Sequence, residues 1–308
     1  MSPEFAVALI VAVVLSATPI LIAALGELVV EKSGVLNLGV EGMMLIGAVT
    51  GFIAATATGS PALGALAALL AGAAVSMVFA VLTLTLTANQ VATGLALTIF
   101  GTGVSALLGA SFVGRTTTTF GSVFPAELAT DPIWRVLFGY SPLVYFSLLM
   151  TLAVWWFLKH SRAGLILRAV GENDVSAHSI GYPVLFVRYM AVLFGGAMAG
   201  VAGSFFSLVL TPMWAERLTS GRGWIAIALV VFAAWRPGQL LLGAYLFGAV
   251  ITLELQAKAA GWSGLAPEFL TALPYLATIL VLALISARKV SARNAAPACL
   301  GRPFRATA

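Results

Sequence analysis

Five polar side chains stand in otherwise apolar stretches of this sequence and are its candidates for chemistry: Asn37, Glu41, Asn89, Gln90 and Thr93. The first two belong to SGVLNLGVEGMMLIGA (33–48), and the other three belong to TANQVATG (87–94). Amides, hydroxyls and carboxylates form hydrogen bonds, and in apolar surroundings such groups cost free energy unless they are paired or hydrated. The pattern predicts a polar route through an apolar body.

Glu41 allows two interpretations. A carboxylate inside a membrane segment is a candidate functional group. It could instead cap backbone N–H groups where a helix is broken, because the N-terminal end of a helix carries partial positive charge. The glycines around Glu41 favour the capping role.

The elements that position these side chains must be membrane helices. Of the 308 residues, 61% are hydrophobic and 9% are charged, whereas soluble proteins lie near ~45–50% and ~25%. Residues 42–114 contain no Asp, Glu, Lys, Arg or His, and ~20 apolar residues suffice for one span. The composition excludes a soluble enzyme and predicts a polytopic membrane protein.

We therefore predict an all-α integral membrane fold with about 8–10 transmembrane helices. The nine predicted spans are 5–25, 38–57, 62–86, 90–110, 141–158, 184–210, 219–235, 239–257 and 268–286.

Two of these spans are broken or short and are expected to line a central pathway. Residues 33–48 open a span with glycines, an asparagine and a carboxylate. Residues 223–235 supply only ~20 Å of helix against a ~30 Å hydrocarbon core. Interrupted helices often line the cavity of a transporter. The alternative is that both segments are complete helices, which extend into their flanking residues and pack closely through glycine.

Charge placement predicts the domain organisation and the orientation. Residues 1–286 should form one transmembrane domain, and residues 287–308 form a basic tail. Loop 159–183 and the tail are rich in Lys and Arg, and such segments face the cytoplasm. The C-terminus should therefore lie inside, and loop 111–140 and the N-terminus should lie outside. The basic residues are explained by topology, so no nucleic-acid partner is expected.

Missing motifs narrow the function further. The sequence has no Gly-x-x-x-x-Gly-Lys-Ser/Thr loop, so the chain carries no P-loop ATPase of its own. Its single cysteine, Cys299, permits no intrachain disulfide and no cysteine metal cluster. No predicted span carries the carboxylate pair expected of a proton-driven carrier. The sequence thus predicts a pore-forming or scaffolding body that takes its energy from elsewhere.

The loop GLILRAVGENDVSAHSIGYP (164–183) predicts a short capped helix. Gly171 can break the preceding helix, and Asn173 or Asp174 can cap the next one through about Ser179. Gly181 and Pro183 then end it. Such a helix suits docking into a partner's groove, and the alternative is a helix that lies on the lipid surface.

Three segments resemble one family. Residues 32–48, KSGVLNLGVEGMMLIGA, resemble the signature of membrane permease subunits of bacterial ABC importers in the ribose/branched-chain amino acid permease superfamily. The sequence GVLNLGVEG is most similar to the motif of the nucleoside-type branch, which is paired with basic-membrane-lipoprotein receptors. Residues 167–181 resemble the ATPase-coupling segment of that family, with Asp174 in place of a proline, and residues 221–248 match a third block.

The resemblance implies a transporter subunit that is not an enzyme and that sits in the bacterial cytoplasmic (inner) membrane. It implies a second, homologous permease subunit, two cytoplasmic ATPase domains and an extracytoplasmic lipoprotein receptor as partners. This chain would bind no cofactor, and ATP and Mg would be held by the ATPases. The implied ATPase-coupling residues are Arg168, Gly171, Glu172, Asn173, Asp174, Ala177 and Gly181.

The implied substrate is a nucleoside, which is neutral and offers hydroxyls and base edges for hydrogen bonds. The five polar candidates suit such a solute, and Trp214 and Trp224 could stack on a base or anchor the chain at the membrane interface. One alternative is a permease for a simple sugar such as ribose or galactose. A second alternative is a channel or scaffold that works without an ATPase.

Overall fold

The computed structural model describes residues 3–125, 131–260 and 296–305, with scattered positions between 269 and 283. All regular elements in these ranges are helices. Isolated β-bridges join Val113 to Trp214 and Thr116 to Met213.

Seven helices of the described ranges are long and apolar enough to cross a membrane. They are α1 (Pro3–Lys32), α2 (Val40–Thr58), α3 (Pro61–Ala80), α4 (Gln90–Gly109), α6 (Pro142–His160), α9 (Val184–Phe205) and α11 (Pro237–Ala259). Single π-helical turns extend α3 to Thr85 and α9 to Leu210. The shorter helices are α5 (Pro132–Phe138), α7 (Arg162–Glu172), α8 (Asp174–Ser179) and α10 (Arg222–Phe232).

These helices confirm the all-α polytopic fold. Seven predicted spans correspond to the seven long helices, and the predicted span 268–286 lies largely outside the described residues. The predicted span 219–235 is not a full span. It contains α10, whose 11 residues extend ~16 Å.

The break that separates the first two predicted spans, residues 26–37, is mostly wrong. Helix α1 continues through it to Lys32, because Leu28, Val29 and Val30 keep the segment apolar and are buried. The helix ends where Gly34 adopts φ +91°, a conformation that glycine reaches without steric cost. Only residues 33–39 lie outside a helix between α1 and α2.

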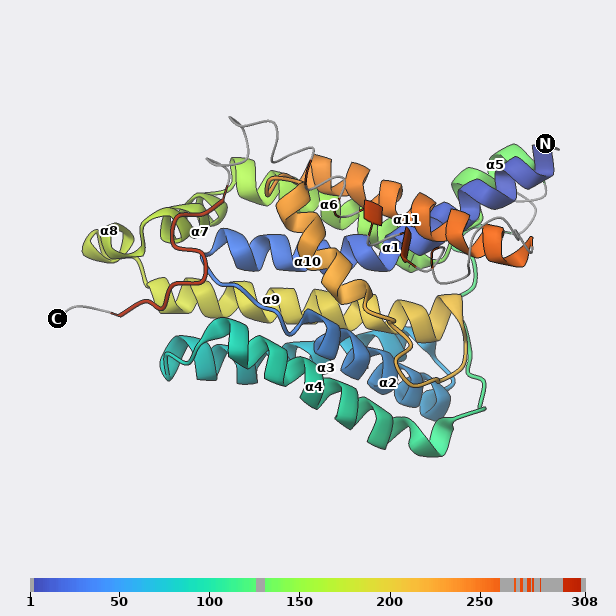
Figure 1. Cartoon of the computed structure of the whole chain (residues 1–308), viewed down its shortest axis with the longest axis horizontal. Coiled ribbons are helices and arrows are strands. Elements are labelled where there is room, and N and C mark those ends of the chain that lie inside the picture. The colour runs from blue at the N-terminus through green and yellow to red at the C-terminus, as the bar shows by residue number, and fades with distance from the viewer. Residues whose placement is uncertain are drawn as a thin grey trace.

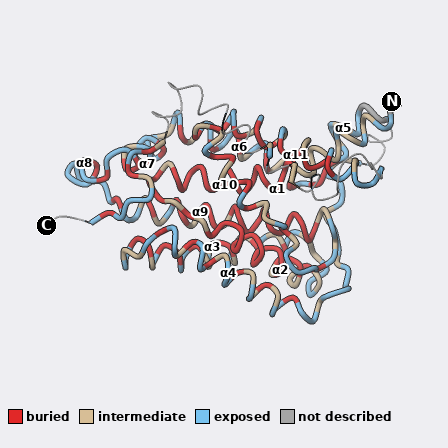
Figure 2. Tube along the Cα trace, in the orientation of Figure 1, coloured by how far each residue is buried: buried red, intermediate tan, exposed pale blue. Residues whose placement is uncertain are grey.

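Helices α1 and α9 form the middle of the molecule (Figure 1). Helix α9 packs on α2 and α3, and α1 packs on α6, α10 and α11. One end of the bundle carries α7, α8 and residues 296–305, and we call it the α8 end; the opposite end, with α5, is the α5 end. The buried residues concentrate in the central helices, and the outer helices expose many of theirs (Figure 2).

Two segments turn back into the bundle without helical structure. Residues 33–39, the first re-entrant segment, lead from the α8 end to the start of α2 (Figure 1). Residues 211–221, the second re-entrant segment, lead from the α5 end to the start of α10. The N-termini of α2 and α10 meet inside the bundle, where a Cβ added to Gly223 would lie 2.7 Å from Cα of Glu41.

The two broken regions are related by an inverted repeat. The order α1, re-entrant segment, α2, α3 recurs as α9, re-entrant segment, α10, α11, with the opposite direction through the bundle. The packing recurs too, because α1 contacts α11 and α10 as α9 contacts α3 and α2. Inverted repeats of this kind place binding sites of transporters at the interface between the repeats.

Glycine also permits the close packing that the sequence predicts. A Cβ on Gly47 of α2 would overlap the backbone of Gly200 on α9, and one on Gly196 would overlap Ser76 of α3. Small residues let membrane helices approach closely, where apolar burial alone does little to hold them together. Broken helices and glycine packing, posed as alternatives from the sequence, therefore occur together.

Candidate functional site

The carboxylate of Glu41 joins the two broken regions. Its Oε1 accepts hydrogen bonds from Thr219 Oγ1 at 2.5 Å and from the Gly221 N–H at 2.9 Å, and its Oε2 accepts one from the Gly223 N–H at 2.6 Å. Glu41 is itself 6% exposed. Because it stands in the first turn of α2 and at the start of α10, its negative charge offsets the positive ends of both helix dipoles. The capping geometry expected of Glu41 is present, but the capped helix is α10 and not the helix that carries Glu41.

The N–H groups of Ser33, Gly34 and Val35 still bond to carbonyls of α1. Beyond them, side chains hold the first re-entrant segment, because its backbone groups need partners in apolar surroundings. The Leu36 N–H donates to Gln90 Oε1 at 2.8 Å, and the Asn37 N–H donates to Glu27 Oε1 at 3.1 Å. Thr98 Oγ1 donates to the Leu38 carbonyl at 3.0 Å. Gln90, predicted as a pathway residue, thus lies against the segment that contains Asn37.

The remaining predicted pathway residues lie in different surroundings. Asn37 is fully buried, and its Oδ1 accepts from the Gly39 N–H at 2.9 Å. Asn89 is exposed and caps α4 by accepting from the Ala92 N–H at 2.9 Å. Thr93 is half-buried one turn into α4. The structure therefore brings Asn37 and Gln90 together, and it places Asn89 in a local cap.

Two buried carboxylates in α1 were not among the predicted site residues. Glu27 and Glu31 are 1% and 0% exposed, and they lie one turn apart. Glu31 Oε2 accepts from Trp235 Nε1 at 2.6 Å. The expectation that no span carries a carboxylate pair is thus wrong, because the pair lies in the helical part of the predicted break. The spacing i, i+4 in a continuing apolar run was the available signal.

The two tryptophans proposed for base stacking lie in different surroundings, and Trp224 directly follows Gly223, whose N–H donates to Glu41. Trp214 is 1% exposed and packs with Ala48, Val49 and Phe52 in a small core. Trp224 follows Gly223 in α10 and is 36% exposed. Trp214 therefore contributes to packing.

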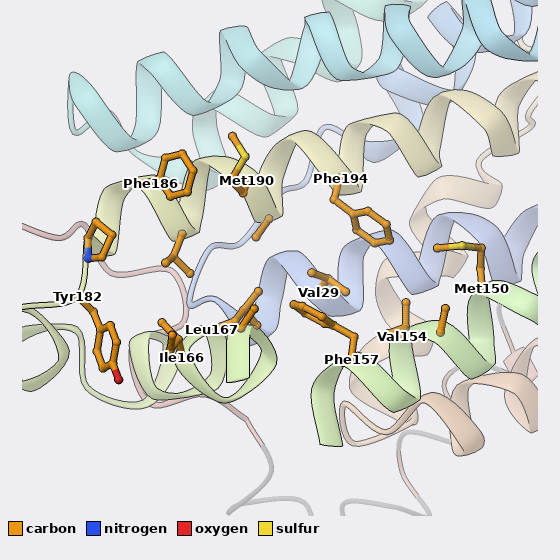
Figure 3. Close-up of a pocket in the computed structure, with 15 residues that line it drawn as sticks. Val29, Met150, Val154, Phe157, Ile166, Leu167, Tyr182, Phe186, Met190 and Phe194 are labelled. Carbon is orange, nitrogen blue, oxygen red and sulfur yellow. The ribbon is translucent and has the colours of Figure 1, made fainter. Parts of the chain in front are cut away.

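A cavity of about 540 Å³ is a groove between α9 and the pair α6–α7, with Val29 of α1 also lining it (Figure 3). Its labelled walls include Phe157, Leu167, Phe186 and Phe194. Among the lining residues, Tyr182 alone carries a strong side-chain hydrogen-bond donor or acceptor. The groove is therefore unsuited to a polar solute.

The predicted capped helix is present as α8. Asn173 Oδ1 accepts from the Ser176 N–H at 2.9 Å, which makes Asn173 the N-cap. The helix ends at Ser179, and Gly181 follows with φ +92°. Gly171, expected to break the preceding helix, lies inside α7, which ends one residue later. A Cβ on Gly171 would overlap the Lys32 carbonyl, so this glycine permits α7 to pack on the end of α1.

A buried ion pair fastens α8 to α9. Arg188 is 0% exposed, and its Nη2 lies 3.0 Å from Oδ2 of Asp174, the first residue of α8. The same guanidinium donates to the Ser33 carbonyl at 3.1 Å. Helix α8 is therefore linked through one side chain to the first re-entrant segment. Arg188 was not among the predicted site residues.

The predicted coupling residues divide by exposure. Asp174 and Ala177 face inward, and Ala177 packs with Val170, Val184 and Phe304. Arg168, Glu172, Asn173 and Gly181 are exposed. An exposed face of α8 also includes Val175 and Ser176.

Part of the basic tail packs on the body. The Cys299 N–H donates to the Gly171 carbonyl at 2.9 Å, and the Gly301 N–H donates to the Gly34 carbonyl at 3.1 Å. Cys299 and Phe304 are each 8% exposed. Apolar side chains and backbone hydrogen bonds thus hold residues 296–305 against α7 and the first re-entrant segment.

Comparison with known proteins agrees with this architecture. Residues 9–285 match the family described as branched-chain amino acid transport system / permease component. The chain is 40% identical to the putative glucose ABC transporter permease protein TsgC13 of Haloferax volcanii, over 96% of this chain and 97% of that protein. It is 29% identical to the guanosine ABC transporter permease protein NupQ of Bacillus subtilis, over 86% and 88% of the two chains. It is 28% identical to the nucleoside ABC transporter permease protein NupC of Lactococcus lactis subsp. cremoris, over 89% and 90%.

A family match across nearly the whole membrane body, with broken helices inside it, makes this chain a membrane-embedded transport subunit and not an enzyme. It belongs to the branched-chain amino acid transport system / permease component family, the permease subunits of ABC transporters.

Proposed function

We propose that this permease translocates nucleosides across the bacterial cytoplasmic membrane by alternating access, driven by ATP hydrolysis on a partner chain. The observation that carries the proposal is the meeting of α2 and α10 at Glu41, inside an inverted repeat. Discontinuous helices that meet at a repeat interface frame the binding site in transporters of similar design. Rocking of one repeat against the other would open this region to one side at a time.

The chemistry of the site favours a neutral solute. Glu41 is engaged by three donors and its charge is offset locally, so it offers no free charge to a substrate. Two buried polar atoms beside the first re-entrant segment, Gln90 Nε2 and Glu27 Oε2, have no hydrogen-bond partner among the described residues. We propose that the route passes these atoms, with Asn37 beside them and with Asn89 and Thr93 at its α8 end.

The relatives support two substrate classes. Two of them, from different bacteria, carry names for nucleoside or guanosine transport. A third, with 40% identity, is named for putative glucose transport. We therefore propose a nucleoside as substrate and keep a glucose-type sugar as the second candidate, since both offer a neutral ring with hydroxyls.

The family and the exposed face of α8 support a proposal for the partners. We propose that the exposed face of α8 docks on one of two cytoplasmic ATPase domains, which hold ATP and Mg. A second permease subunit would complete the pathway, and an extracytoplasmic lipoprotein would deliver the substrate. The ion pair between Asp174 and Arg188 would then transmit movement of α8 to the first re-entrant segment.

Uptake measurements test the substrate. Cells that express the complete transporter should take up labelled guanosine, and excess adenosine should compete because it shares the ribose ring, whereas excess glucose should leave uptake unchanged. A strain without this permease is the control. Competition by glucose but not by adenosine would replace the nucleoside with the sugar as the substrate.

Cysteine labelling tests the orientation. In a Cys299→Ser background, single cysteines replace Ser122 and Ser176, which are both exposed. An impermeant maleimide added to intact spheroplasts should label position 122 and spare position 176, because α8 should face the cytoplasm. Both positions should react after permeabilisation. Labelling of position 176 alone in intact spheroplasts would reverse the proposed orientation.

A further inference from the structure

A second cavity, of about 610 Å³, lies at the α8 end on the side of α6 and α7 that faces α1 and α11. Four basic residues from four parts of the chain line it: Lys32, Lys159, Arg168 and Arg236. They come from the end of α1, the end of α6, the middle of α7 and the turn before α11. We call this cavity the basic pocket.

Aromatic rings form part of the pocket wall and orient its cations. The Lys159 ammonium lies 5.3 Å from the centre of the Trp155 ring, and the Lys32 ammonium lies 6.0 Å from that of Trp235. The hydrogen bond from Trp235 Nε1 to Glu31 fixes the second ring. The two lysines of the pocket are therefore placed by contacts with aromatic rings.

The carboxylates of this neighbourhood accept hydrogen bonds from other groups. Glu31 accepts from Trp235, and Glu172 accepts from the Ala298 N–H at 3.4 Å. Both carboxylates also attract Lys32 and offset part of its charge. Among the described residues, Lys159, Arg168 and Arg236 form no ion pair. The start of α11 adds to the positive potential, because Gly238 and Gln239 line the pocket and no side chain caps this helix.

We propose that the basic pocket binds the phosphate group of an anionic phospholipid. The pocket lies where α1 and α6 end and α11 begins, which is the level of the membrane interface in the placement proposed above. Trp155, Leu158 and Pro237 give it apolar walls beside the cations. Basic pockets between transmembrane helices on the cytoplasmic side suit anionic lipid headgroups. A small soluble anion would gain nothing from the apolar walls.

The inference rests on the proposed membrane placement and sidedness, and it does not depend on the substrate. Its test is lipid binding by the purified full chain. The result can therefore be interpreted even if the chain does not transport nucleosides. Native mass spectrometry would compare phosphatidylglycerol with phosphatidylcholine, and inorganic phosphate would be added as a competitor.

Lys159→Gln combined with Arg236→Gln should weaken phosphatidylglycerol binding about 30-fold, from ~1 kcal/mol for each basic residue near an anionic headgroup. Phosphatidylcholine binding should not change. The matched control is Arg162→Gln combined with Arg305→Gln, which removes two exposed arginines from the same end of the bundle but not from the pocket. An unchanged thermal unfolding temperature would show that the pocket variant is folded.

Three results would overturn the proposal. Equal loss of phosphatidylglycerol in both double variants would indicate general attraction to the charged surface. Displacement of the lipid by millimolar inorganic phosphate would make a soluble anion the ligand. If the parent protein does not prefer phosphatidylglycerol over phosphatidylcholine, the pocket does not bind an anionic lipid, and an acidic side chain of the ATPase becomes its expected ligand.

Discussion

Glu41→Ala should abolish substrate uptake and lower the free energy of unfolding by about 2–6 kcal/mol. The Gly221 and Gly223 N–H groups would lose their shared acceptor, and each buried donor left unsatisfied costs about 1–3 kcal/mol. The positive ends of α2 and α10 would also face each other without the carboxylate between them. Thermal unfolding in detergent and uptake at matched expression measure the two effects.

Three further variants separate capping from substrate binding. Glu41→Gln should also fail, because an amide keeps one acceptor oxygen and turns an NH₂ group toward an N–H donor. Thr219→Val removes one hydroxyl donor and should cost only about 1 kcal/mol. Glu216→Gln, on an exposed part of the second re-entrant segment, is the control and should behave as the parent. If Glu41→Gln folds normally and raises only the KM for uptake, Glu41 contacts the substrate and its capping role is secondary.

Arg188→Met should destabilise the protein by about 3–5 kcal/mol, because removal of one partner leaves the other charge buried without compensation. Arg188 is fully buried, and the side chain of Asp174 is 12% exposed. The change also removes the donor to the Ser33 carbonyl, so α8 loses its link to the first re-entrant segment. Substrate-stimulated ATP hydrolysis by the assembled complex should fall to its basal rate.

A double-mutant cycle isolates the ion pair. Asp174→Asn combined with Arg188→Met removes both charges and should recover part of the stability lost in Arg188→Met alone. Stimulated ATP hydrolysis should stay low in the double variant, since the link between the two segments remains broken. Arg162→Met, at an exposed arginine in the first turn of α7, is the control. If Arg188→Met and Arg162→Met match in stability and in stimulated hydrolysis, the pair neither anchors nor couples α8.

Local patterns in the sequence determined most of the architecture. Long apolar stretches free of charge predict membrane helices wherever they occur, and α2, α3, α4, α6, α9 and α11 lie close to their predicted ranges. Asn173 and Gly181 predicted the limits of α8, because an N-cap and a left-handed glycine act on their immediate neighbours. The extent of α1 was less clear, since two glutamates in an apolar run look like a loop until their buried partners are known.

The tertiary structure alone decided which distant groups meet. Glu41 reaches donors 178 to 182 residues later in the chain, Glu31 reaches Trp235, and Arg188 joins α8 to residue 33. The fold likewise placed residues 296–305 of the basic tail on α7 and collected four separate cations around one cavity. A hydrogen bond or ion pair between distant segments depends on how helices cross, and helix crossing depends on packing across the whole bundle. A local sequence pattern contains the donor and the acceptor, but it does not specify that they will be neighbours.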